Sequence, residues 1–292
     1  MLLNGMFGIT GAYPLMIQPR SIDSLEPSYP CPRATAYFSS PTVSSPTTPS
    51  QIRFASHLRA TYPLFARLDR ISGVSPTSPD WHNTWDHYFD TLSSRLCHSM
   101  PLPCKDTLPA GERCVTQEEA EEVFRLGMWE YSHIYRDAPE SLRASAAGMG
   151  VWLAEVAQHV RDVVNGRGEL RYVHNVAHDG SIARVLGALQ IESMVWPGLG
   201  SEIVFEVYRW KDEQKDQQEE QHKDVEGQES GSGSEDANSG FSLRVLWGGR
   251  VFSSSDPTLG EMDMVPLERF LTYVDGLVGH RASKVKEMCG LE

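Results

Sequence analysis

The organisation of this 292-residue chain is decided by one stretch, Tyr172-Val-His-Asn-Val-Ala-His-Asp-Gly-Ser-Ile-Ala-Arg-Val-Leu-Gly-Ala-Leu189. The apolar run over residues 170–177 predicts a short, largely buried strand. A polar turn containing His178 and Asp179 follows it, and helical spacing then resumes. A strand, a tight turn and a helix form half of a parallel βαβ unit, and in open α/β sheets ligands bind outside the carboxyl ends of the strands. The sequence therefore predicts an α/β protein with His178 and Asp179 at a ligand-binding edge.

Amphipathic patterns predict four further helices around this stretch. Aromatic and leucine residues recur at helical spacing over residues 81–92. Thr116 and Glu119 form a capping box, in which a hydroxyl and a carboxylate satisfy the unpaired N–H groups of a helix start. Longer apolar faces run over residues 140–164 and 266–277. Helices are thus expected on both sides of the predicted strand.

Three strands are predicted in the second half of the chain. The first lies around residues 203–207, and residues 243–246 and 250–252 form two more. Trp247-Gly248-Gly249 joins the last two, and a pair of glycines is a strong hairpin signal. Residues 17–50 are rich in Pro, Ser and Thr, and we expect irregular surface chain there because proline blocks both helices and central strands.

Charge is distributed unevenly along the chain. The formal net charge is −13, and much of it lies between residues 212 and 236. A nucleic-acid footprint needs clustered Lys and Arg, so no nucleic-acid partner is expected. Residues 212–239 contain only Val225 and Ala237 as apolar side chains. Such a segment buries too little surface to offset its ordering entropy, which predicts a disordered acidic insert.

The sequence contains no apolar run of the ~18 residues that a transmembrane helix needs, so no membrane span is expected. Residues 1–16 are apolar, but they lack a basic beginning and are interrupted by several glycines and Pro14. This is a poor signal peptide, and it leaves the compartment of the protein undetermined.

The cysteines allow two interpretations. There are five, with no Cys-x-x-Cys pair, which argues against a zinc ribbon; they are Cys31, Cys97, Cys104, Cys114 and Cys289. Three of them lie within eighteen positions in a stretch rich in Pro and Gly. A loop disulfide in an oxidising compartment and unpaired thiols in a reducing compartment both fit this pattern.

No metal or cofactor site is expected. His82, Asp86 and His87 share a predicted helix, but adjacent side chains do not readily face one ion. His174 and His178 are four residues apart, and no third ligand follows at a suitable spacing. The sequence also has no Walker loop, no dinucleotide fingerprint and no Gly-x-Ser-x-Gly.

The stretch quoted above resembles the histidine acid phosphatases when it is taken with its neighbours. Trp196-Pro197 and the strand from Glu202 to Arg209 follow it in the order found in that family, and residues 243–251 and 264–270 look like the family's closing hairpin and final helix. The resemblance covers residues 116–292. It implies a three-layer α/β sandwich of the phosphoglycerate mutase-like type with an α-helical cap.

The resemblance also implies how the chain is divided. Residues 1–30 would be a remnant of the α/β core, and residues 31–135 a mostly helical cap region. Residues 136–211 and 240–292 would form the α/β core, interrupted by the insert at 212–239.

Members of the family hydrolyse phosphate monoesters through a phosphohistidine, so that two easier steps replace one hard step. By resemblance, Asp179 is the proton donor to the leaving group and His178 contacts the phosphoryl group. The expected partner is therefore a phosphate monoester substrate.

One departure from the family is large. The family's nucleophile lies in an Arg-His-Gly-x-Arg-x-Pro motif, and this sequence contains no Arg-His-Gly. We therefore expect the chain to begin inside the fold, without the first core strand, and to be inactive as written. Two further hypotheses are a non-catalytic pseudophosphatase that binds a partner and an interaction protein that exposes the acidic insert.

Overall fold

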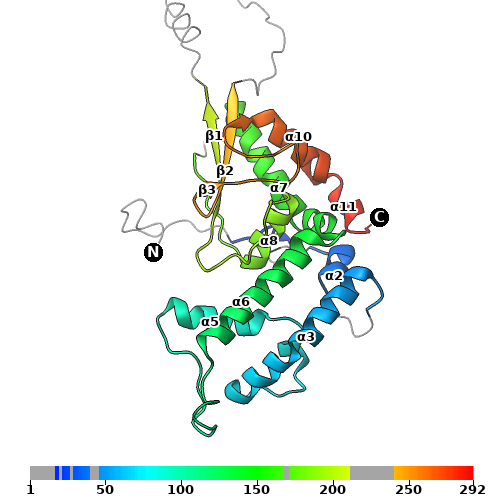
Figure 1. The fold of residues 1–292 in the computed structure, drawn as a ribbon. Helices are drawn as coiled ribbons and strands as arrows, with labels where there is room; N and C mark the ends of the chain where they lie inside the picture. The colour runs from blue at the N-terminus through cyan, green and yellow to red at the C-terminus, as the bar shows by residue number, and fades with distance from the viewer. Residues whose placement is uncertain are drawn as a thin grey trace, which may run out of the picture.

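The computed structural model describes residues 17–19, 22–26, 29–39, 46–167, 171–210 and 240–291. This part of the chain is a mixture of helices and one small sheet (Figure 1). The longer helices are α2 (Pro32–Ser39), α3 (Pro49–Ser72), α5 (Asp86–Cys97), α6 (Gln117–Ser132), α7 (Ser141–Val164), α8 (Asp179–Ala188) and α10 (Leu267–Val278). The shorter ones are α4 (Pro79–His82), η3 (His133–Asp137), η4 (His280–Ala282) and α11 (Val285–Met288). The strands are β1 (Ile203–Arg209), β2 (Phe241–Trp247), β3 (Arg250–Val251) and β4 (Val265–Pro266).

The described sheet is antiparallel throughout. Strand β2 pairs with β1 from Ile203 opposite Trp247 to Arg209 opposite Phe241, and it also pairs with β3 and β4. Gly248 and Gly249 connect β2 to β3, and both have the positive φ that a two-residue hairpin turn requires, 55° and 74°. The predicted strand near residue 203 and the predicted hairpin are therefore confirmed.

The strand predicted over residues 170–177 is wrong for the described residues 171–177. These residues contain no strand and are exposed, and residue 170 lies outside the described part of the chain. Apolar, β-branched composition favours a strand only where a neighbouring strand supplies hydrogen bonds and packing. No described strand pairs with this segment, so the parallel βαβ half is absent from the described residues.

Helix α7 lies at the centre of the first hydrophobic core. Its buried face meets α8, α10 and α11, and the cluster also includes residues of strand β2; among its members are Leu153, Leu186, Leu243 and Phe270. The predicted helix over residues 140–164 is confirmed, and its end at Asn165-Gly166 is confirmed by a φ of 67° at Gly166. The predicted C-terminal helix is confirmed by α10.

The second hydrophobic core is formed by α3, α5 and α6. Phe65 stacks on Trp85 with ring centroids 3.7 Å apart, and Leu68, Leu92 and Val123 pack around them. The capping box of α6 is confirmed, because Thr116 and Glu119 each bond the other's backbone N–H. The single helix predicted over residues 81–92 is wrong, since α4 and α5 are separate helices.

The break between α4 and α5 follows from the environment of Trp85. Its backbone N–H donates to the buried carboxylate of Glu130 at 2.8 Å, which replaces the bond it would make inside a continuous helix. Trp81 still packs edge-on against Tyr88 with ring centroids 5.0 Å apart. The spacing of the aromatic residues therefore predicted a buried face correctly, but it did not predict the break between α4 and α5.

The segment over residues 17–50 is more ordered than predicted. Pro32 and Pro49 stand at the first position of α2 and α3, where a missing N–H costs nothing. Thr48 and Gln51 form a second capping box at the start of α3. Expecting irregular chain throughout was wrong here, because proline at a helix start favours the helix.

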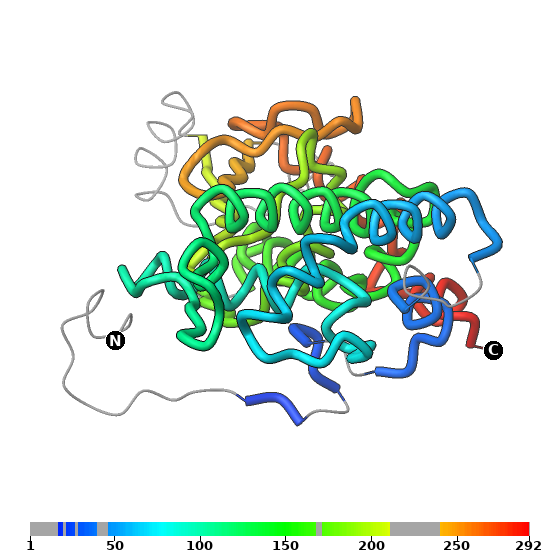
Figure 2. The backbone as a smooth tube through the Cα atoms, turned by 60° about the horizontal axis from the view of Figure 1, so that its bottom comes forward, coloured from blue at the N-terminus to red at the C-terminus, as the bar shows by residue number. Residues whose placement is uncertain are grey.

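Two disulfides are formed among the five cysteines. Cys104 bonds Cys114 within a loop, and Cys31 bonds Cys289 near the C-terminal end of the chain. Figure 2 shows α2 (blue) beside the C-terminal segment (red), which the second disulfide joins. Cys97 is unpaired and exposed. The sequence left open a loop disulfide or unpaired thiols, and the structure contains the loop disulfide, between Cys104 and Cys114.

The acidic insert predicted at residues 212–239 lies outside the described residues. Within the described part, no helix has the length and apolar character needed to cross a bilayer.

Candidate functional site

His178 and Asp179 lie at the N-terminus of α8. His178 is the N-cap, with φ −100° and ψ 164°, and Asp179 is the first helical residue, so the helix starts earlier than the sequence indicated. The Asp179 carboxylate turns back on its own helix, where Oδ1 accepts the N–H of Gly180 at 2.6 Å. The predicted pair thus stands at a helix start, which is a place that favours negative charge.

The Asp179 carboxylate is held by two aromatic side chains from other elements. Tyr131 of α6 and Trp196 each donate a hydrogen bond to Oδ2 at 2.8 Å. Trp196 is itself stacked between Phe89 and Tyr131, with ring centroids 3.9 and 4.0 Å apart. Burial raises the pKa of Tyr131, and the charges of Tyr135 and Asp179 raise it further, so this phenol remains a donor. The carboxylate therefore has a fixed position at the edge of the second core.

A second carboxyl group belongs to the same neighbourhood. Partial loss of hydration raises the pKa of Asp90, and the negative charges of Asp179 and Asp86 raise it further. Asp90 lies on α5, one turn after Asp86. Two interacting carboxyl groups with different environments can divide the roles of proton donor and charged group between them. Sequence reasoning missed Asp90, and its spacing from Asp86 on the predicted helix was the available signal.

The described contacts of His178 do not involve this aromatic group. Its side chain is 71% exposed, and Nε2 pairs with the carboxylate of Glu26 at 2.6 Å. A hydrogen bond holds the segment around Glu26 against α8, because the hydroxyl of Ser181 donates to the carbonyl of Leu25 at 2.6 Å. The structure therefore keeps His178 and Asp179 adjacent in the chain but gives them separate surroundings.

The histidines considered as metal ligands have other partners. His82 contacts Asp69 at 3.0 Å, and the same carboxylate accepts the hydroxyl of Tyr88 at 2.6 Å. His174 forms a hydrogen bond with Tyr172 at 3.2 Å. Within the described ranges, no three His, Cys, Asp or Glu side chains gather in a geometry that could hold an ion.

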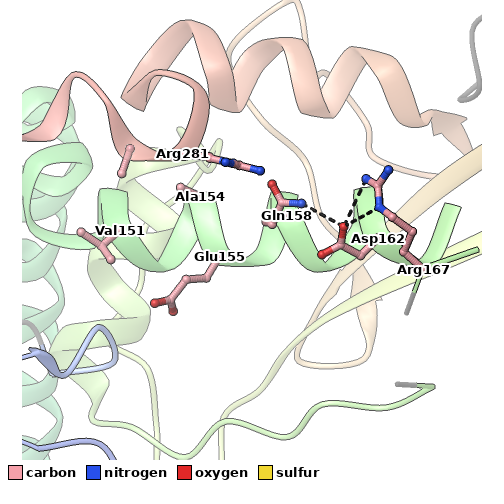
Figure 3. Close-up of a pocket in the computed structure, with 8 residues that line it drawn as sticks. Val151, Ala154, Glu155, Gln158, Asp162, Arg167 and Arg281 are labelled. Carbon is pink, nitrogen blue, oxygen red and sulfur yellow. Dashed lines mark hydrogen bonds and ion pairs between the residues drawn. The ribbon is translucent and has the colours of Figure 1, made fainter. Parts of the chain in front are cut away.

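A cavity that lies elsewhere in the described structure does not include His178 or Asp179 among its lining residues. It has a volume of about 640 Å³ and lies along the outer face of α7, beside η4 (Figure 3). In this cavity Asp162 accepts hydrogen bonds from Gln158 and Arg167, and Arg281 extends toward Gln158 from the other wall. Acidic and basic groups line it together, so its charge selects no single class of ligand.

Comparison with known proteins shows a distant similarity to a curated protein. No family model matches the chain. Over 135 residues the chain is 28% identical to counting factor 60 of Dictyostelium discoideum. The matched stretch is 46% of this chain and spans only 28% of the length of that protein.

Proposed function

We propose that this chain is a histidine acid phosphatase-like protein in which His178 contacts the phosphoryl group of a phosphate monoester and Asp179 donates a proton to the leaving group. The observation that carries this proposal is the placement of both residues at the start of α8. Helix N-termini attract anions, because their N–H groups and the helix dipole both favour negative charge. A carboxylic acid beside a bound phosphoryl group is placed to protonate the departing alkoxide.

The proposed fold is the three-layer α/β sandwich of the phosphoglycerate mutase-like type. Its support is the packing of α7 and α10 against the sheet, where Phe205 of β1 contacts Trp152 and Phe270, together with the exposed segment that leads into α8. Tyr172, Val173 and Val176 are 50%, 48% and 78% exposed. In the proposed fold these apolar side chains would be buried by a further strand, which the described residues do not supply.

The proposal predicts that this chain alone does not turn over phosphate esters. The two-step route needs a nucleophilic histidine, and the sequence has no Arg-His-Gly motif to provide it. The direct test is to assay the sequence-verified chain with nitrophenyl phosphate, next to a longer product whose reading frame encodes Arg-His-Gly-x-Arg-x-Pro upstream. Turnover by the longer product alone supports the proposal. Robust turnover by the chain as given would contradict it.

A second candidate function is a non-catalytic phosphatase-like protein that binds a partner. The ion pair between His178 and Glu26 favours it, because a carboxylate occupies the position beside the imidazole that a phosphoryl group would need. If no longer product with the motif exists, or if it exists and is inactive, this candidate replaces the first.

The role of His178 can be tested on the chain itself. A non-hydrolysable aryl phosphonate should shift the imidazole resonances of His178 in an NMR titration, and Glu26→Gln should strengthen binding because it removes the competing charge. His178→Ala should weaken it. Unchanged His178 resonances at saturating phosphonate would show that the residue does not contact the phosphoryl group.

A further inference from the structure

A second, smaller pocket lies between α2, α7 and α8. It has a volume of about 280 Å³, and its walls include Tyr29, Thr35, Phe38, Gly148 and Arg184. We propose that this pocket binds a small oxyanion, such as phosphate, through the guanidinium of Arg184. The inference rests on Arg184 and its surroundings, and it is independent of the roles proposed above for the residues at the start of α8.

Arg184 is a half-buried cation without a carboxylate partner among the described residues. Its guanidinium lies over the ring of Phe38 at 4.7 Å, and Nη1 contacts the carbonyl of Gly180 at 3.4 Å, which is long for a hydrogen bond. A guanidinium carries five N–H donors, so most of them are left for a ligand. Arg67 and Arg161 are also half-buried, yet each meets a carboxylate at 3.0 Å or less.

The pocket is electropositive in a chain whose formal net charge is −13, because no acidic side chain lines it in the described part of the structure. Tyr29 adds no negative charge. Burial raises the pKa of its phenol well above the usual range, and the hydroxyl is directed to the carbonyl groups of Ala147 and Gly148 at 2.6 and 2.7 Å. An anion entering the pocket would therefore meet a fixed cation and no acidic lining side chain, and the charge of Glu155, which lies outside the lining, acts on Tyr29 and raises its pKa.

Gly148 sets the position of the arginine. A Cβ at this residue would lie 3.3 Å from Cδ of Arg184, closer than ordinary contact. The glycine lets the Arg184 side chain come close to α7, and the ring of Phe38 lies near both Gly148 and the guanidinium. A guanidinium held in this way loses little freedom when it binds, and its planar fork matches the paired oxygens of phosphate, sulfate or a carboxylate.

The test is an isothermal titration of inorganic phosphate into the full chain and its variants. Wild-type protein should bind, Arg184→Gln should bind about tenfold more weakly or worse, and Arg184→Lys should fall between them, because it keeps the charge and loses the fork. Arg281→Gln is the matched control, since it removes the same charge from the other cavity and should leave the affinity unchanged.

A second variant covers the case in which Arg184→Gln does not fold. Thr35 is exposed on α2 at the rim of the pocket, so Thr35→Trp should obstruct the pocket while Arg184 stays in place, and it too should weaken phosphate binding. Circular dichroism and thermal melts establish that each variant is folded. Competition by sulfate without acetate would assign a tetrahedral oxyanion, and competition by both would assign oxyanions in general.

Three results would overturn the proposal. The first is the absence of phosphate binding to wild-type protein at millimolar concentration. The second is an equal loss in Arg184→Gln and Arg281→Gln, which would indicate a diffuse charge effect. The third is binding that survives Arg184→Gln and is abolished by His178→Ala, which would place the anion at the start of α8.

Discussion

The indole N–H of Trp196 donates a hydrogen bond to Oδ2 of Asp179 at 2.8 Å. Tyr131 donates to the same oxygen at the same distance, and the two aromatic rings stack on each other. The carboxylate at the start of α8 is therefore oriented by side chains of the second core. A change in the packing of α6 would move the proposed proton donor directly.

Trp196→Phe should destabilise the protein by about 1–3 kcal/mol, because it leaves the stacked ring and removes a hydrogen bond to a charged group. Urea unfolding measures the change. The same substitution at Trp210, which is 61% exposed and donates to the hydroxyl of Ser242, is the control and should cost far less. In an Asp179→Asn background the cost of Trp196→Phe should shrink, and an unchanged cost would show that the bond contributes nothing.

In a form of the protein that carries the nucleophile, Asp179→Asn should slow the hydrolysis of one class of phosphate ester much more than that of another. Esters with poor leaving groups need a proton in the transition state and should slow by about 10²–10⁴-fold. Nitrophenyl phosphate should slow much less, because its oxyanion leaves without help. His178→Ala should slow the hydrolysis of both classes of ester by the same factor, because a phosphate contact does not depend on the leaving group. Steady-state rates of hydrolysis of an alkyl and an aryl phosphate ester measure this difference. Equal slowing of both esters by Asp179→Asn would assign that residue a structural role.

His133 should make stability depend on pH. Burial lowers its pKa below the usual 6.5, so the folded state favours the neutral ring, which contacts Ser50 and stacks on Trp129. The stability that this provides is complete above pH 6.5, and it is lost as the pH falls through the folded-state value. Urea unfolding at pH 7.5 and pH 5 should show a smaller difference in His133→Asn than in wild type. His98→Asn, at an exposed position, should keep the wild-type difference.

Gly187→Ala and Gly276→Ala should act in opposite directions. At Gly187 a Cβ would lie 2.3 Å from the carbonyl oxygen of Tyr135, so the two helical segments must separate, at a cost of about 1–3 kcal/mol or more. At Gly276 on α10 nothing lies within 4 Å of the same atom. Alanine there should stabilise by up to about 1 kcal/mol, because it improves helix propensity. Thermal melts of both variants provide the comparison, and destabilisation by Gly276→Ala would count against the described packing of α10.

The features that could be predicted from the sequence are those with local causes. The capping box at Thr116, the end of α7 and the Gly248-Gly249 hairpin each depend on a few neighbouring residues, and each is present in the structure. Whether residues 170–177 form a strand could not be predicted from neighbouring residues, because a strand forms only where another strand pairs with it. The start of α3 at Pro49 was missed because proline was taken as a breaker, although it is favourable at a first helical position.

The candidate site shows the same division. His178 and Asp179 could be singled out from their place in a recognisable stretch. Tyr131, Trp196 and Asp90 come from three different segments, and only the tertiary structure brings them near Asp179. The unpaired state of Arg184 was equally invisible, since it depends on which side chains do not reach it.

The bond between Cys31 and Cys289 joins positions 258 residues apart in the sequence. Any single cut by a protease between them produces two fragments that remain covalently joined. Such a nicked protein would run as one species on a gel without reductant and separate into two bands after reduction. Limited proteolysis of this chain must therefore be followed under both conditions, because molecular mass alone would report a cleaved molecule as intact.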